Sequence, residues 1–278
     1  MTKPVLKCLL SGLLLISSIS AFAGGFPVRP KSLLLSPSVS YFFSTGGWDG
    51  NSALKPFENN GKFQATTFSL YSEYGLTRRF TLVAVLPYAN NSYKDNAGNN
   101  STASGLADLE VGVRYYLANI AYKYYFSLQG TFIQPLYKNL NLGFQAQGAE
   151  LKVSFAGSGK FLGKNSYFTL ENGVRQYFGG AGPIQDRYSG TFGVTLDRRF
   201  KHQVSASIGG FYSASSINSA FNPQIIGTNK DFAFNQASLS YGYSVTKKFS
   251  FFLSAGQFIA GRNTGKGSSG SVAFIIRP

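Results

Sequence analysis

Residues 67–88 read TFSLYSEYGLTRRFTLVAVLPY, in which two alternating runs are separated by one short basic turn. In the first run Phe68 and Leu70 fall on one face, and Thr67 and Ser69 fall on the other. A period of two is that of a β-strand, because successive side chains of a strand point to opposite faces of a sheet. The stretch therefore predicts two antiparallel strands joined by a tight turn.

The same arrangement recurs along the rest of the chain. Twelve alternating runs can be marked, and the connections between them are long and short in turn. The runs lie near residues 33–44, 64–76, 80–88, 106–117, 122–134, 149–161, 166–177, 188–197, 203–213, 233–245, 249–259 and 270–277. Short periplasmic turns that alternate with longer extracellular loops are typical of outer-membrane barrels. A soluble β-sandwich is the competing architecture, and it does not explain this strict alternation.

The composition also favours a barrel in a membrane. Only 13% of the 278 residues are charged, whereas a soluble domain normally has about 25%. A strand of about ten residues tilted by roughly 40° spans about 25 Å of hydrocarbon. An open sheet edge there would leave backbone groups unpaired at several kcal/mol each, so the sheet must close. The predicted fold is all-β: a transmembrane antiparallel up-and-down β-barrel of about twelve strands.

The first 23 residues differ from the rest. Lys3 and Lys7 form a basic leader, a short apolar core follows, and AFA ending at Ala23 fits the small-residue rule for cleavage. We interpret 1–23 as a cleaved signal peptide and 24–278 as the barrel domain; a short membrane anchor is the alternative. Together with the barrel, the leader predicts location in the outer membrane of a Gram-negative bacterium. The one cysteine lies inside the leader, so the mature chain forms no disulfide.

The net charge is strongly positive. The formal value is +15, and loss of Lys3 and Lys7 with the leader lowers it by two to +13. Such a balance often indicates a nucleic-acid partner, but export argues against one here. The predicted partners are outer-membrane lipids (lipopolysaccharide and inner-leaflet phospholipid), the machinery that inserts barrels and a small-molecule solute.

Paired basic residues occupy three of the short turns. They are predicted to lie on the periplasmic side, where their charges meet lipid phosphates and neighbouring aromatic rings mark the edge of the hydrocarbon. The alternative is that basic turns only keep the exported chain soluble. The basic residues are Arg78, Arg79, Arg198, Arg199, Lys247 and Lys248. The rings expected at the opposite edge are Tyr41, Tyr88, Phe178, Tyr188 and Phe258.

The sequence does not favour an enzyme. Its one histidine, His202, falls in a short turn, away from where a hydrolase barrel would need it. With one histidine and one cysteine, a metal site of those ligands is not expected. We therefore predict no catalytic residues, no metal-binding residues and no cofactor-binding residues.

The inner face of the barrel carries the charges that bear on function. Alternation places ten on this face: Glu73, Asp108, Glu110, Arg114, Lys123, Glu150, Lys152, Glu171, Arg175 and Asp197. Charges are tolerated there only if they are hydrated or paired. They could line an aqueous path that selects solutes, or pair across the lumen and close it. A barrel of eight strands is filled by its side chains, whereas a barrel of sixteen strands leaves a wide channel. A count of twelve therefore does not decide between these two alternatives.

We favour a narrow passive pore or uptake channel for small solutes, hydrophobic, aromatic or anionic. The alternative is a closed structural or surface-interaction barrel whose loops, 45–63, 89–105 and 214–231, bind a partner. The segment 218–232 is the best candidate for a loop that folds into the lumen, although a plain surface loop is the simpler expectation.

Residues 66–117 resemble a family of bacterial outer-membrane barrels named for the meta-pathway of phenol degradation, whose relatives are described as transporters. The matching residues are Tyr74, Gly75, Leu76, Thr77, Pro87, Tyr88, Gly105, Leu106 and Asp108. Ala107 departs from the family, which usually has glycine there, and the chain ends four residues beyond Phe274 where barrels usually end on an aromatic residue. The resemblance implies a barrel that takes up aromatic or other hydrophobic small molecules.

Overall fold

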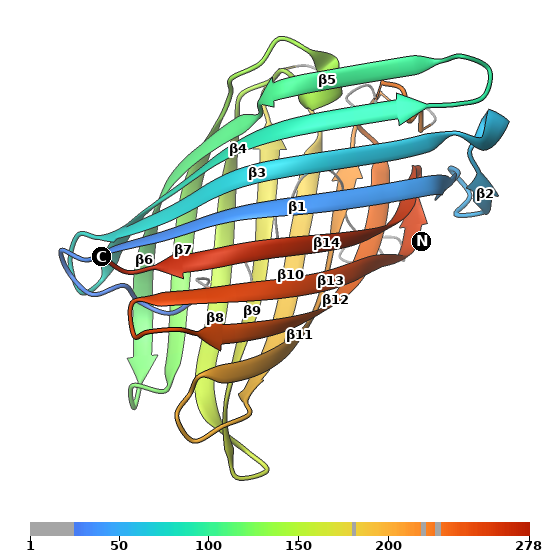
Figure 1. Ribbon diagram of the computed structural model, residues 1–278. Coiled ribbons are helices and arrows are strands. Elements are labelled where there is room, and N and C mark those ends of the chain that lie inside the picture. Colours follow the sequence, from blue (N-terminus) through green and yellow to red (C-terminus); the bar gives the residue numbers. More distant parts are fainter. Residues whose placement is uncertain (1–24, 180–181, 218–220, 226–228) are drawn as a thin grey trace, which may run out of the picture.

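The computed structural model describes residues 25–179, 182–217, 221–225 and 229–278, so the predicted leader lies outside the described residues. Within them, fourteen strands form one antiparallel sheet, and twelve close into a barrel because β14 pairs with β1 (Figure 1). Neighbours in the barrel are neighbours in the chain, which confirms the predicted up-and-down topology. The barrel strands are β1 (Leu33–Trp48), β3 (Lys62–Gly75), β4 (Phe80–Lys94), β6 (Asp108–Ile120), β7 (Tyr124–Pro135), β8 (Gly148–Phe161), β9 (Lys164–Tyr177), β10 (Ile184–Thr195), β11 (His202–Ala214), β12 (Phe232–Ser244), β13 (Phe249–Arg262) and β14 (Thr264–Ile276).

Alternation along each strand separates the two faces of the barrel wall. On β3 the side chains of Phe68 and Leu70 are 54% and 42% exposed, whereas those of Thr67 and Ser69 are 5% and 6% exposed. A closed sheet has this arrangement when its apolar side chains face outward and its small polar ones face the interior. No helix within the described ranges is long and apolar enough to cross a membrane.

The stretch 89–105 differs from the predicted loop. β4 continues to Lys94, and the added strand β5 (Asn100–Leu106) turns back along it, from Tyr88 opposite Leu106 to Lys94 opposite Asn100. A one-residue irregularity at Ala107 separates β5 from β6, and its N–H donates to the carbonyl of Pro87. The outward side chains here are polar, so the alternation that marks a membrane strand is lost although the backbone stays extended. A short strand, β2 (Leu54–Pro56), likewise extends the wall beside β1.

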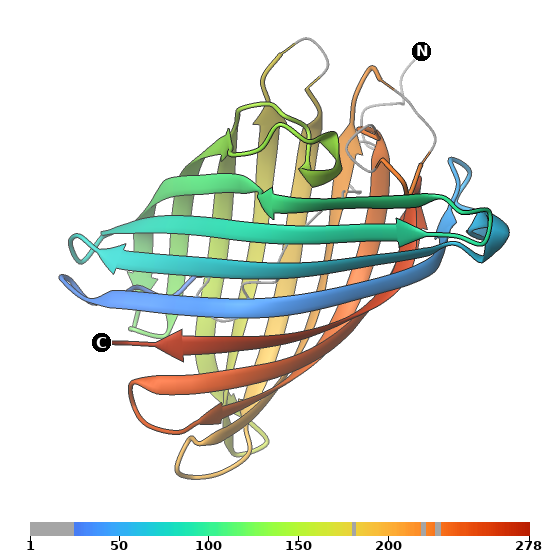
Figure 2. The same ribbon diagram turned by 45° about the horizontal axis from the view of Figure 1, so that its top comes forward.

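Two long connections pack against the inner face at the end of the barrel where the loops lie. After β7, residues 136–147 bring Leu142 against Ala89 and Ala103, and Figure 2 shows this connection beside β5. The amide of Asn91 donates to the carbonyl of Asn141 at 2.7 Å. The connection 215–231, where it is described, also enters: Phe221 packs with Phe63 and Tyr93. For 218–232 the simpler expectation was a surface loop, but its described residue Phe221 packs inward, and the connection after β7, which the sequence did not indicate, packs inward as well.

The recurrent basic turns share one hydrogen-bonding device. Thr77 Oγ1 accepts from the N–H groups of Arg79 and Phe80, and Thr246 Oγ1 accepts from those of Lys248 and Phe249. In the third turn the carboxylate of Asp197 accepts hydrogen bonds from the N–H groups of Arg199 and His202. The hydrogen bond from His202 is the main cause that holds the pKa of Asp197 below the usual range. A short polar side chain that caps the following backbone N–H groups stabilises a tight turn. The repeated motif is thus a turn signal as well as a source of charge.

Candidate functional site on the inner face of the barrel

The structure brings most of the predicted inner-face charges together and leaves two outside. Lys123 lies exposed in the turn between β6 and β7, and Asp197 caps the turn between β10 and β11. Both expectations were wrong because the two-residue period ends where the strand ends. The side chains on the inner face are Glu73, Asp108, Glu110, Arg114, Glu150, Lys152, Glu171 and Arg175.

The largest ion-pair network is centred on Arg175 of β9. Its Nη2 lies 2.5 Å from Glu110 Oε1, and its Nε lies 2.7 Å from Glu150 Oε2. Arg187 on β10 approaches Glu150 Oε2 to 2.6 Å and stacks over the ring of Phe211, with Cζ 4.6 Å from the centroid. Arg187 is not among the predicted inner-face charges, because the alternating run in the sequence begins at residue 188, whereas β10 begins at Ile184. The network joins β6, β8, β9 and β10 across the interior.

A second pair joins β6 to β3 across the intervening strand β4. Arg114 Nη1 is 2.7 Å from Glu73 Oε1, and these side chains are 2% and 1% exposed. Arg114 Nε also donates to Gln129 Oε1 at 3.0 Å, and the hydroxyl of Tyr71 bonds to both members of the pair. Lys152 Nζ lies 3.6 Å from Glu171 Oε2. Because guanidinium and carboxylate are paired in this way, the inner wall has little unbalanced charge.

The opposite wall carries hydroxyl groups where this wall carries charges. One row in register runs from Ser205 on β11 through Ser240, Ser254 and Ser271 to Ser40 on β1 and Thr67 on β3. Ser205 lies near the turn end of its strand and Thr67 lies nearer the loop end, so the row climbs the lumen. Some hydroxyls bond to each other, as do Ser240 and Ser254 at 2.7 Å. No sequence pattern indicated the row, because only strand register aligns residues so far apart.

Aromatic rings fill the loop end of the interior. Phe234 and Phe258 stack with centroids 3.8 Å apart, and Phe258 is only 8% exposed. Phe258 therefore faces inward and does not belong to the outer aromatic edge, because unbroken alternation along β13 puts it on the same face as the buried side chains of Ser250 and Phe252. The buried cluster is Trp48, Ile133, Phe144, Tyr177, Phe211, Phe232, Phe234 and Phe258. It includes the single tryptophan of the chain.

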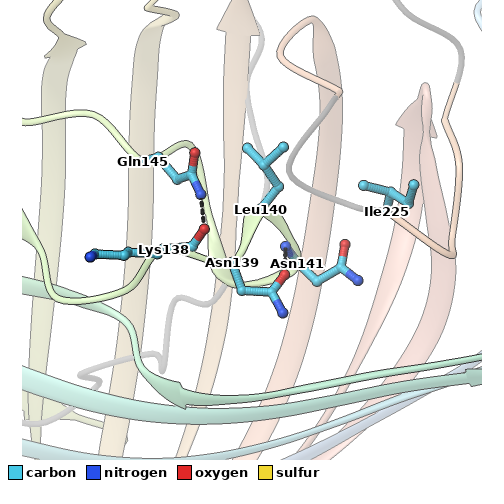
Figure 3. Close-up of a pocket in the computed structure, with 6 residues that line it drawn as sticks. All are labelled: Lys138, Asn139, Leu140, Asn141, Gln145 and Ile225. Carbon is cyan, nitrogen blue, oxygen red and sulfur yellow. Dashed lines mark hydrogen bonds between the residues drawn. The ribbon is translucent and has the colours of Figure 1, made fainter.

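A wide, solvent-open depression of about 600 Å³ lies beside the inward connections. Figure 3 shows Ile225 facing the segment 138–145 across it, and the side-chain amide of Gln145 donates to the carbonyl of Lys138. The remaining lining residues are Asn139, Leu140 and Asn141. Amide, apolar and single basic groups together suit a small molecule with polar and apolar parts.

The described part of the chain holds no group of three or more histidine, cysteine, aspartate or glutamate side chains placed to bind a metal ion. His202 lies on the outer face, where its Nδ1 is 2.7 Å from the hydroxyl of Tyr241.

Solved structures match this architecture over most of the chain. An outer membrane channel from Pseudomonas putida F1 aligns with a TM-score of 0.72 at 13% identity, covering 92% of this chain and 98% of that one. The chain has the fold of bacterial outer-membrane β-barrels. The β domain of the Bordetella autotransporter BrkA gives a TM-score of 0.54 at 12% identity, covering 88% and 99%, and the NanC porin gives 0.52 at 9%, covering 87% and 98%. No protein-family model and no curated protein matches the sequence.

Proposed function

We propose that this protein is an outer-membrane channel for passive uptake of small uncharged solutes that have an apolar or aromatic part. The similar structures include an outer membrane channel and a porin, which supports a channel in that membrane. The sequence resemblance of residues 66–117 to barrels linked with phenol degradation points to the same solute class.

The pairing of interior charges is the observation that carries this proposal. Arg175 and Arg187 are bound by Glu110 and Glu150, so these groups offer little net field to a passing ion. Selective ion conduction needs a ring of unbalanced charge or of coordinating carbonyls. The anionic solutes considered from the sequence are therefore disfavoured, and uncharged ones are favoured.

The aromatic cluster supports an apolar part in the solute. A molecule entering from the loop end meets the stacked rings of Phe234 and Phe258 and the indole of Trp48 before it meets the serine row. Aromatic faces and edges bind other aromatic rings at about 0.5–1.5 kcal/mol beyond area burial. Hydroxyl groups farther along then hydrogen-bond to a polar substituent.

Trp48 allows a direct test, since it is the only tryptophan and its side chain is 8% exposed. We expect its fluorescence in the folded, detergent-solubilised barrel to be quenched by acrylamide, which is small and uncharged, and much less by iodide or caesium. Cells that lack their own general porins and express the barrel should accumulate benzyl alcohol faster than benzoate. Equal rates for the two solutes would refute the proposed selectivity.

A closed structural or surface-interaction barrel is the second candidate. It is favoured by the inward packing of Leu142 and Phe221, which narrows the loop end. On this reading the connections bind an outside partner, and neither acrylamide nor any tested solute reaches the interior. A folded barrel that neither conducts in a planar bilayer nor admits acrylamide would support it.

The proposed orientation places the basic turns in the periplasm. The ring of Phe274 faces outward and stacks on Phe249 at 5.9 Å, so it is available to the insertion machinery although it is not the last residue. Single cysteines at Arg78 or Lys247 should resist impermeant reagents on intact cells, whereas one at Asn96 should react. Labelling of a cysteine at position 78 on intact cells would show that the barrel has the opposite orientation.

A further inference from the structure

Four rows of outward side chains lie in register across β3, β4 and β5. Their order along the strands is apolar, polar, polar and then basic. Starting from the middle of the barrel, the rows are Phe68, Tyr88 and Leu106; Thr66, Asn90 and Ser104; Gln64, Ser92 and Thr102; and Lys62, Lys94 and Asn100. All three strands contribute one side chain to each row, so the rows form one continuous surface.

The first row marks the upper edge of the apolar band. Phe68, Tyr88 and Leu106 are 54%, 42% and 41% exposed on the outer face. Aromatic rings at this place are typical of the level where hydrocarbon meets headgroups. The two rows above consist entirely of hydroxyl and amide side chains, which can donate and accept hydrogen bonds with sugar hydroxyls.

The last row contains an unusual pair. Lys62 and Lys94 are directly opposite in the antiparallel ladder, which places their Cβ atoms about 4.5–5.5 Å apart. Like charges in that position destabilise a sheet. Among the described residues neither ammonium has an ion pair within 4.0 Å, and the nearby carboxylate of Asp95 is bound by Asn99 and by the N–H of Ala97. An external anion would relieve this repulsion.

The spacing sets the depth of each group. Lys62 lies six positions from Phe68, which at about 3.3 Å per residue and a tilt of roughly 40° raises it ~15 Å above the aromatic row. At that height the outer leaflet contains the phosphorylated and carboxylated sugars of its glycolipids, and no acyl chains.

We propose that the outer face of β3, β4 and β5 is a binding site for one lipopolysaccharide molecule. Its acyl chains pack on the row of Phe68, its sugars hydrogen-bond to the two polar rows, and an anionic group of its core lies between Lys62 and Lys94. The site rests on the outer-membrane location in the proposed function and is independent of transport, because a barrel that conducts nothing still presents this surface.

The site is tested with a double variant, Lys62→Gln and Lys94→Gln, in the full mature barrel folded in detergent. Its matched control is Lys247→Gln with Lys248→Gln, which removes the same charge from the opposite end. Heat-modified gel migration first shows that each variant is folded. Thermal unfolding is then followed during titration with purified lipopolysaccharide, with phosphatidylglycerol vesicles and with inorganic phosphate.

Lipopolysaccharide should raise the melting temperature of the wild type and of the control, and its apparent affinity should be weakened at least about tenfold in the double variant. A Lys62→Arg, Lys94→Arg variant should retain the affinity. Equal affinity in the Gln variant would overturn the site. So would an equal shift with phosphatidylglycerol or phosphate, since the surface would then recognise any anion. The solute experiments with Trp48 are separate, so failure of either proposal leaves the other measurable.

Discussion

Arg114 on β6 and Glu73 on β3 form an ion pair of 2.7 Å across the intervening strand β4, with side chains only 2% and 1% exposed. Removing one member of such a pair leaves the other charge buried without compensation, which typically costs about 3–5 kcal/mol. The pair therefore couples three strands of the wall near the end with the short turns.

We expect Arg114→Ala to lower the free energy of unfolding by about 3–5 kcal/mol, because Glu73 would remain buried without its partner. Urea unfolding in detergent or lipid, followed by tryptophan fluorescence, measures the change. Arg78→Ala is the control, since Arg78 lies exposed in a turn. A stability for Arg114→Ala equal to that of the control would show that the pair contributes little.

Arg175→Gln should change ion selectivity. The substitution removes a positive charge that faces Glu110 and Glu150 and leaves Arg187 alone to balance them. The lumen should then prefer cations, and the reversal potential in a tenfold KCl gradient should move toward the cation limit. Arg199→Gln, which removes a turn charge, should not move it. An unchanged potential in a conducting Arg175→Gln barrel would place the network outside the ion path.

The inward connection after β7 should be released by Leu142→Ala. Leu142 is 4% exposed and packs on Ala89 and Ala103, so its truncation should cost about 2–5 kcal/mol of local stability. Acrylamide should then quench Trp48 faster, while the barrel keeps its heat-modified migration. Leu140 in the same turn is 39% exposed, and Leu140→Ala should leave quenching unchanged. If acrylamide quenches Trp48 at the same rate in both variants, the connection does not restrict the entry of acrylamide into the barrel.

The same connection should loosen at high pH. Burial, followed by the charge of Asp108, raises the pKa of Tyr137 far above that of a free tyrosine, and its hydroxyl donates to Asp108 at 2.9 Å. A raised tyrosine pKa gives stability that is complete below about pH 10, the unfolded value, and is lost as the pH rises through the folded value.

Quenching of Trp48 should therefore increase above about pH 10 in the wild type. Tyr137→Phe should show the faster quenching already at neutral pH, with a weaker alkaline increase. Tyr122→Phe, at a position 84% exposed, serves as the control and should behave as the wild type does. A Tyr137→Phe protein with an unaltered pH profile would assign the alkaline change to another group.

The basic turns are a feature that the local sequence predicts correctly. The pattern of a short polar residue, two basic residues and phenylalanine correctly marked tight turns at Thr77 and Thr246, because a cap acts on backbone groups two or three residues away. The local pattern does not predict the positions of Lys123 and Asp197, because both residues lie in turns beyond the ends of the strands, where the two-residue period no longer holds. It also missed β5, whose outward residues lack the apolar signal of a lipid-facing strand.

The sequence alone determined the closed barrel, its twelve membrane strands and the alternation of faces, since these follow from a two-residue period and from unpaired edges in hydrocarbon. Only the tertiary structure decided which charges meet. Arg175 reaches Glu110, 65 residues away, and Ser205 aligns with Thr67, because closure of the sheet fixes the register of every strand. The inward position of Leu142 depends likewise on small side chains supplied by β4 and β5. Contacts between distant segments are set by packing, and no local pattern records them.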